Sequence, residues 1–229
     1  MHVDLLVGAP NLARSGELDG IAPATVLEVL RLLDKNTYDI LHYAGHGDFD
    51  ADDPEMRAGW LFGERLFTAR ELSSVTRVPA LVVANACLSS LTSNFRTTAT
   101  PEGRSRLRAA DDDLLPGLVD EFFMRGVRNY VGTAWPISDV GAILFCTTLY
   151  THLLPGANAG VSQSLGNALW IARRALKERE SSFGALWAAY QHYGDPSFVL
   201  QEAKSTDDQA TVAALARKAK TIRQPRKRT

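Results

Sequence analysis

The run from Pro79 to Cys87 limits the fold of this chain more than any other stretch of its sequence. Its residues are almost all apolar, at odd and even positions alike, and it has the length of a β-strand. A strand with apolar side chains on both faces has to be covered on both faces, which is typical of parallel sheets between two layers of helices. The run therefore predicts an α/β protein.

The other segments fit the same architecture. Apolar runs indicate further strands at 3–8, 38–44 and 127–135, and the run at 38–44 also has the continuous pattern of a strand covered on both faces. Apolar residues at helical spacing predict helices at 24–35, 114–125, 138–153, 162–179 and 183–192. Without an internal repeat, this alternation predicts helices on both faces of a mainly parallel sheet.

Three shorter segments connect these elements. Residues 59–68 indicate a hairpin that turns near Gly63, and Thr68 with Glu71 at its third position forms a capping box for a helix that runs to Ser74. Residues 92–113 indicate a long, exposed and mobile loop, because they combine four arginines with Pro101, Gly103 and three aspartates. Residues 196–200 are expected to form a last short strand or an extended segment.

Composition and charge exclude several classes of protein. The chain has 229 residues, of which 45% are hydrophobic and 22% charged, so it is neither disordered nor fibrous. No apolar run reaches the roughly 18 residues of a membrane helix, and the first residues do not resemble a signal peptide, so we expect a cytoplasmic protein with no membrane contact. Residues 217–228 carry seven basic side chains and no acidic one. Such a tail either remains solvated or touches an acidic partner or nucleic acid.

The sequence also lacks the motifs of several common chemistries. There is no phosphate-binding or dinucleotide-binding glycine motif, no serine-hydrolase G-x-S-x-G and no H-E-x-x-H, so we expect no cofactor. His42 and His46, placed on one strand face, could hold a metal ion, but no third or fourth ligand is evident nearby. Two distant cysteines form neither a disulfide scaffold nor a zinc site, and we therefore expect no metal.

A nucleophile and a base are expected at one edge of the sheet. Two predicted strands end at His46 and at Cys87, and the carboxyl ends of parallel strands share an edge where α/β proteins bind ligands. A free thiol is mostly protonated at neutral pH, and a neighbouring imidazole can activate it. The N–H groups of Gly47 and Cys87 could then stabilise an oxyanion. The alternative is that Cys87, like Cys146 on its apolar helix, is a small core residue.

The residues around His46 and Cys87 resemble the two catalytic blocks of caspase-like cysteine peptidases, in particular the CHAT family. These blocks are His42–Gly47 and Ala84–Cys87, and similar landmarks occur at 59–72, 126–139 and 193–198. The resemblance implies a three-layer α/β/α caspase-like fold with a mainly parallel central sheet and a small β-hairpin insertion. It also implies peptide-bond hydrolysis by the Cys87 thiolate, with His46 as general acid and base.

The resemblance leaves the substrate preference open. In caspases an arginine that binds the substrate aspartate follows the tryptophan after the corresponding strand, but here Pro136 follows Trp135, so we expect aspartate to be disfavoured. Asp48, Asp50 and Asp139 could pair with a basic residue before the cut bond, unless Asp139 only caps the helix that follows. A pocket formed by Asn85, Trp135 and Ile137 would instead favour an apolar or small residue.

The expected organisation is one peptidase domain over residues 1–201, followed by a polar and then basic tail over 202–229. Family members usually have another strand and helix before the segment that resembles residues 3–8. Either the domain is cut from a longer protein, or the edge strand comes from elsewhere. The resemblance implies a protein substrate, a regulatory module or partner, and a role in bacterial defence or signalling. The alternatives are a catalytically silent binding module and, with no aromatic residues to support it, nucleic-acid binding through Arg96–Arg108 and the tail.

Overall fold

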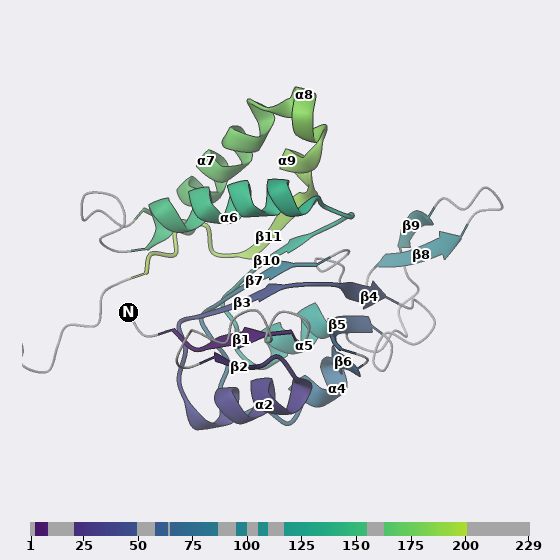
Figure 1. The fold of residues 1–229 in the computed structure, drawn as a ribbon, viewed down its shortest axis with the longest axis vertical. Helices are drawn as coiled ribbons and strands as arrows, with labels where there is room; N and C mark the ends of the chain where they lie inside the picture. The colour runs from purple at the N-terminus through teal and green to yellow at the C-terminus, as the bar shows by residue number, and fades with distance from the viewer. Residues whose placement is uncertain are drawn as a thin grey trace, which may run out of the picture.

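The centre of the molecule is a four-stranded sheet with helices on both faces (Figure 1). The computed structural model describes residues 3–8, 21–49, 58–63, 65–86, 95–99, 105–109, 117–154 and 163–200. The strand order is β11-β10-β7-β3, where β3 (Ile40–Ala44), β7 (Leu81–Asn85) and β10 (Asn129–Thr133) are parallel and β11 (Tyr190–Gly194) is antiparallel. The predicted three-layer, mainly parallel architecture is confirmed.

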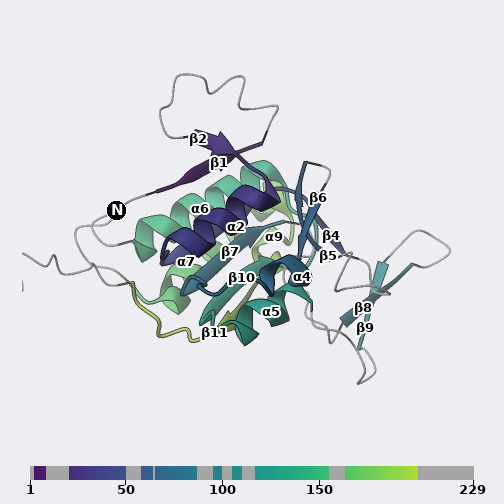
Figure 2. The same ribbon diagram turned by 90° about the horizontal axis from the view of Figure 1, so that it is seen from below.

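The position of β7 in the middle of the sheet explains why its residues are apolar at odd and even positions alike. All five of its residues are buried, and Val82 and Ala84 face one core while Leu81 and Val83 face the other. The first core lies under α2 (Val26–Lys35) and α5 (Leu118–Met124), seen in front of the sheet in Figure 2. Because both faces are covered, β7 has no solvated side on which a polar residue could alternate.

The opposite face is covered by α6 (Asp139–Leu153) and α7 (Leu165–Lys177), followed by the short helices α8 (Glu180–Phe183) and α9 (Leu186–Ala189). Ser138 begins α6 by accepting a hydrogen bond from the Gly141 N–H. Phe145 of α6 stacks on Tyr190 of β11, with ring centroids 3.4 Å apart, and so joins the helical layer to the sheet.

The predicted hairpin is confirmed and belongs to a three-stranded antiparallel sheet. This sheet contains β4 (Gly47–Phe49), β5 (Ala58–Phe62) and β6 (Arg65–Thr68). Gly63 turns between β5 and β6 with φ of 64°, a left-handed value that favours glycine. The capping box of Thr68 and Glu71 is also present, although α4 (Ala69–Leu72) ends before Ser74.

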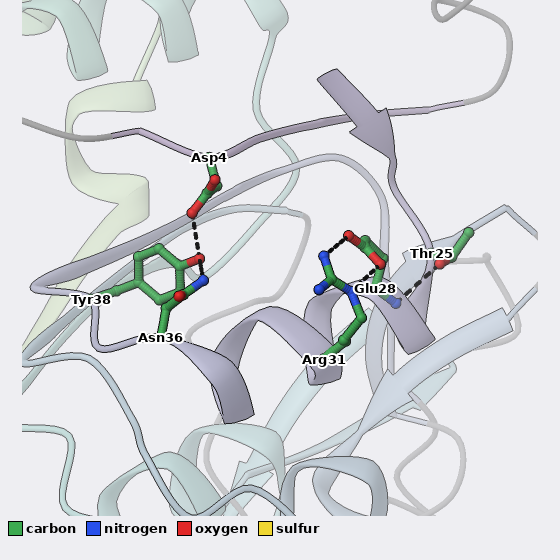
Figure 3. Close-up of polar contacts among 6 residues, drawn as sticks. All are labelled: Asp4, Thr25, Glu28, Arg31, Asn36 and Tyr38. Atoms are coloured by element: carbon green, nitrogen blue, oxygen red, sulfur yellow. Dashed lines mark hydrogen bonds and ion pairs between the residues drawn. The ribbon is translucent and has the colours of Figure 1, made fainter. Parts of the chain in front are cut away.

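The N-terminal strand forms, but it lies outside the central sheet. β1 (Leu5–Val7) pairs in parallel with β2 (Ile21–Pro23), and this two-stranded sheet is separate from β3. Figure 3 shows how its start is tied down: the Tyr38 hydroxyl donates to Asp4 over 2.6 Å. Nearby, Thr25 caps α2 through the Glu28 N–H, and Glu28 pairs with Arg31 at 2.5 Å.

In three segments the structure differs from the prediction. Residues 95–99 and 105–109 form an antiparallel strand pair, β8 (Phe95–Ala99) and β9 (Ser105–Ala109), within the stretch expected to be a long loop. The helix expected at 183–192 is replaced by α9 and the antiparallel strand β11. Residues 196–200 contain no strand: Pro196 and Ser197 form a turn, and residues 198–200 have no regular secondary structure. β3, the outer strand of the sheet, is covered only in part: Tyr43 packs in one core and Ile40 against the other, while His42 and Ala44 are exposed.

None of the helices in the described ranges is long and apolar enough to cross a membrane.

Candidate active site

The predicted site begins where β3 and β7 end side by side. Their register pairs Ala44 with Asn85, and the Gly45 N–H extends the ladder by donating to the Asn85 carbonyl over 3.1 Å. His46 follows two residues after Ala44, and its side chain is exposed. Cys87 follows two residues after Asn85 in the chain and lies outside the described residues, so its pairing with His46 remains a prediction.

Tyr43 fixes the main chain at His46. Its buried hydroxyl lies 2.8 Å from the His46 carbonyl oxygen and 2.9 Å from that of Leu61, and its ring stacks on Trp60 at 4.7 Å. The Leu61 N–H donates to the same His46 carbonyl over 2.9 Å. Burial raises the pKa of Tyr43 to about 12, so the hydroxyl stays protonated, and remains a donor, well into the alkaline range.

The glycine between Tyr43 and His46 is required by this contact. A Cβ atom at position 45 would lie only 2.5 Å from the Tyr43 hydroxyl oxygen, closer than side chains approach. Gly45 therefore leaves room for the tyrosine to reach the His46 carbonyl, and the pattern Tyr43-Ala44-Gly45-His46 has a packing cause.

The β4–β5 ladder sets the direction of the Gly47 N–H, which is expected from the sequence to be an oxyanion donor. It pairs with Trp60 in the β4–β5 ladder, and the hydrogen bond from the Leu61 N–H to the His46 carbonyl makes this a non-hydrogen-bonded pair. In such a pair both N–H groups point away from the partner strand. The Gly47 N–H is therefore directed away from β5.

The end of β7 is held from the neighbouring strand β10. Thr133, a fully buried residue at the end of β10, donates its hydroxyl to the Ala86 carbonyl over 2.5 Å. Ala86 directly precedes Cys87 in the chain. The main chain is thus held by hydrogen bonds at Ala86, after β7, as well as at His46, after β3.

A polar cluster lies between this end of the sheet and α6. The Asn85 side-chain amide donates to the Cys146 sulfur over 2.8 Å, and burial raises the pKa of the Cys146 thiol to about 11. A protonated, half-buried thiol of this kind is a poor nucleophile. His42 contacts Tyr150 of α6 over 2.6 Å, and desolvation along this contact lowers the pKa of its imidazole.

The metal site considered for His42 and His46 does not form as the sequence suggested. β3 ends at Ala44, so His46 no longer belongs to the strand face that carries His42. No group of three or more metal-ligating side chains occurs within the described ranges.

The predicted substrate-binding residues lie on several elements of this end of the molecule. Asn85 is 8% exposed, and no described residue forms a hydrogen bond with its side-chain oxygen. Trp135, after β10, is 38% exposed, while Ile137 is half-buried against the α6 core. Asp139 and Asp48 are both exposed, and Ser138 rather than Asp139 is the cap of α6. Asp50 lies outside the described part of the chain.

Sequence reasoning missed the supporting roles of Tyr43 and Thr133. Tyr43 belongs to a predicted strand and to the block His42–Gly47, and Thr133 belongs to the landmark at 126–139, but the side-chain contact of neither residue was predicted. A signal was present for the first: a tyrosine two residues before a glycine and three before a histidine places its hydroxyl at the turn that follows the strand. No local pattern indicates the contact from Thr133 to Ala86, because 47 residues separate them.

The mainly parallel sheet between two layers of helices, with a small hairpin beside it, is a caspase-like α/β/α fold. The sequence model of the CHAT domain matches residues 5–195, and the chain belongs to the CHAT domain family. This family assignment confirms the resemblance on which the sequence analysis relied.

Two solved structures are similar to the chain in fold. One is the Arg-specific cysteine proteinase gingipain R, with a TM-score of 0.52 and 14% identity over 79% of this chain. The other is the separase–securin complex of Saccharomyces cerevisiae, with a TM-score of 0.49 and 16% identity over 81% of this chain. The chain spans 38% of the gingipain chain and 11% of the second chain. A search of the curated proteins found no match.

Proposed function

We propose that the chain is a cysteine endopeptidase that cleaves a protein substrate through Cys87 and His46. The observation that carries the proposal is the parallel pairing of β3 and β7, whose matched ends, Ala44 and Asn85, each precede one of the two residues by two positions. Membership of a family with a cysteine-peptidase fold supports the same chemistry.

In this mechanism the His46 imidazole accepts the thiol proton, and the Cys87 sulfur attacks the carbonyl carbon of the substrate. The oxyanion of the tetrahedral intermediate is stabilised by the N–H groups of Gly47 and Cys87. The intermediate collapses, the C–N bond breaks, and the leaving amine takes the proton from His46. Water, deprotonated by His46, then hydrolyses the thioester and restores the thiol.

The substrate class that we propose has a basic residue before the cut bond. Asp139 at the first position of α6 and Asp48 on β4 provide negative charge from the elements that follow β10 and β3. A lysine or arginine would gain charge-assisted hydrogen bonds there, whereas an aspartate would meet charges of its own sign. An uncharged pocket of Asn85, Trp135 and Ile137 would select an apolar or small residue instead.

We also propose that an attached or partner module regulates the peptidase activity, in bacterial defence or signalling. Within the described part of the chain, β3 pairs with a strand only on the β7 side. A strand supplied by a partner could add to its other edge through main-chain hydrogen bonds and order the loops after β3.

One cleavage experiment tests the proposal. A peptide library with every residue before the scissile bond is incubated with the wild type and with Cys87→Ala, His46→Ala and Cys146→Ala. We expect cleavage after basic residues, with a loss of at least about 1,000-fold in Cys87→Ala and His46→Ala and little change in Cys146→Ala. Wild-type turnover in Cys87→Ala would overturn the peptidase assignment, and strong cleavage after aspartate would overturn the substrate assignment.

The same assay separates the peptidase from a silent binding module. A binding module would capture peptides without cleaving them, and its affinity would not depend on the Cys87 thiol. A regulated enzyme would cleave slowly when isolated, with kcat/KM below about 10³ M⁻¹s⁻¹, under the range of most enzymes. A rate for residues 1–229 within the ordinary range would argue against the need for a module.

A further inference from the structure

We infer that Tyr43 and Thr133 are positioning residues of the proposed dyad, each holding the main chain at one of its two members. The inference rests on the proposed function and adds two residues that touch neither the substrate nor the reacting atoms. Both are buried, both come from the central sheet, and both donate a side-chain hydroxyl to a main-chain carbonyl at the same edge.

Thr133 acts on the nucleophile side. The Ala86 carbonyl that accepts its hydroxyl belongs to the same planar peptide group as the amide nitrogen of the next residue in the chain, Cys87. A hydrogen bond that fixes the direction of a carbonyl also restricts the N–H at the other end of that peptide group. Thr133 thereby restricts the Cys87 N–H, the proposed oxyanion donor, and the main chain that carries the Cys87 thiol.

Tyr43 acts on the base side. Its hydroxyl and the Leu61 N–H both lie within hydrogen-bond distance of the His46 carbonyl, at 2.8 and 2.9 Å. The stack of its ring on Trp60 prevents the hydroxyl from swinging away, and Gly45 keeps the path to the carbonyl open. The backbone from which the imidazole projects is therefore held by two strands, β3 and β5.

The two contacts do not depend on each other. Tyr43 lies on the α2 face of β3 and joins it to β5, whereas Thr133 joins β10 to the end of β7. Loss of either hydroxyl should therefore loosen one member of the dyad and leave the other in place. If the two hydroxyls position the dyad, removing either one should change the reactivity of the Cys87 thiol. If they only contribute to packing, the thiol reactivity of the folded variants should not change.

The test measures the reactivity of the Cys87 thiol. The purified 229-residue chain is treated with iodoacetamide between pH 5 and 10, and alkylation of Cys87 is followed by peptide mass spectrometry. The variants are Tyr43→Phe, Thr133→Val and Thr133→Ser. The matched controls are Tyr38→Phe, which removes the hydroxyl bonded to Asp4, and Thr148→Val, which removes a threonine hydroxyl bonded to the Leu144 carbonyl.

We expect Tyr43→Phe and Thr133→Val each to slow alkylation at pH 7 by at least about threefold and to move the midpoint of the pH profile upward, because the imidazole no longer stabilises the thiolate. Thr133→Ser keeps the hydroxyl and should retain the wild-type profile, as should both controls. On a cleavable peptide, Thr133→Val should lower kcat by about 10- to 100-fold with a smaller change in KM.

Unchanged alkylation profiles in Tyr43→Phe and Thr133→Val would overturn the inference, and so would a Thr133→Ser profile that matches Thr133→Val. Circular dichroism and thermal unfolding confirm that each variant is folded. If Thr133→Val does not fold, Thr133→Ala, which also removes the hydroxyl, and Tyr43→Phe decide the question by the same profiles. Failure of the proposed function gives a different result: the wild type cleaves no peptide, while its Cys87 alkylation profile still depends on His46, Tyr43 and Thr133.

Discussion

Gly45 shows how a single position can link the fold of this protein to its candidate site. The residue extends the ladder between β3 and β7 through its own N–H, and its missing side chain lets the Tyr43 hydroxyl reach the next residue, His46. Tyr43 cannot move aside easily, because its ring is stacked on Trp60 and packed near Phe62. The glycine is needed here for a close approach, not for an unusual backbone angle.

We therefore expect Gly45→Ala to lower the free energy of unfolding by about 1–3 kcal/mol, since the new methyl group must displace a well-packed ring. Urea denaturation measures the loss. In the double variant Tyr43→Phe with Gly45→Ala, the 2.5 Å clash with the hydroxyl oxygen disappears, although the ring carbon Cζ remains 2.8 Å from the new methyl group. The loss in the double variant should therefore be smaller than the sum of the two single losses. Strictly additive losses would show that the Tyr43 hydroxyl is not the group that requires this glycine.

Among the elements, those with a strong apolar pattern were predictable from the sequence. β7 and α7 follow directly from their runs, and the capping box marks the start of α4 within one residue. β11 was not predictable because its apolar residues continue the spacing of the helix before it. Its strand structure comes instead from pairing with β10, where Tyr190 lies opposite Thr133. β2 has only three residues and ends in proline, so it carries almost no local signal.

Part of the candidate site was likewise predictable from the sequence, and part was not. The position of His46 follows from the end of an apolar strand, which the sequence displays. The hydroxyl contacts that hold the backbone there join segments that are distant in the chain, as in Tyr43 with Leu61 and Thr133 with Ala86. Such contacts depend on strand register and side-chain direction, which composition and periodicity do not determine.

The capping box of α4 gives a prediction at the scale of one element. The Thr68 hydroxyl and N–H donate to the Glu71 carboxylate over 2.5 and 3.0 Å, and the same hydroxyl accepts from the Arg70 N–H. We expect Thr68→Ala to cost about 1–2 kcal/mol of unfolding free energy and Thr68→Ser to cost much less, as measured by thermal or urea unfolding. Equal losses in the two variants would show that the methyl group, rather than the cap, provides the stability.

This loss should also depend on pH. Burial alone would raise the pKa of Glu71, but the hydrogen bonds from Thr68 outweigh it and hold the pKa below its ordinary value of 4.5. A lowered pKa in the folded state gives stability that is present above pH 4.5 and is lost as the pH falls through the folded value. The difference between the wild type and Thr68→Ala should therefore shrink in acid.

At the scale of the whole molecule, five ionisable hydroxyl and thiol groups of the described residues lie in or beside the two cores. Tyr43 and Tyr130 lie in the core beneath α2 and α5, and Tyr190 lies in the core beneath α6, near the half-buried Cys146 and Tyr150. Burial raises the pKa of every one of these groups. The fold thus favours their neutral forms, so ionisation of these groups at alkaline pH lowers the stability of the folded protein.

This distribution predicts a loss of stability that begins near pH 9. The Cys146 thiol has an ordinary pKa of 9.0 and a folded pKa of about 11, and for Tyr43 the values are 10.0 and about 12. When the folded pKa is the higher one, the unfolded chain loses its proton first. The stabilisation is therefore complete below the unfolded pKa and is lost as the pH rises through the folded pKa. Cys146 should begin the decline, and the tyrosines should continue it above pH 10.

Urea unfolding of the reduced protein at intervals between pH 8 and 11 measures this decline. A single thiol that ionises only in the unfolded state contributes a slope of about 1.4 kcal/mol per pH unit between the two pKa values. Cys146→Ala removes that contribution, so its unfolding free energy should fall less steeply between pH 9 and 10, whatever its starting stability. Thr147→Ala, at the exposed neighbouring position of α6, should keep the wild-type slope. If Cys146→Ala declines as steeply as the wild type, the alkaline sensitivity resides in the tyrosines of the two cores and not in the thiol beside Asn85.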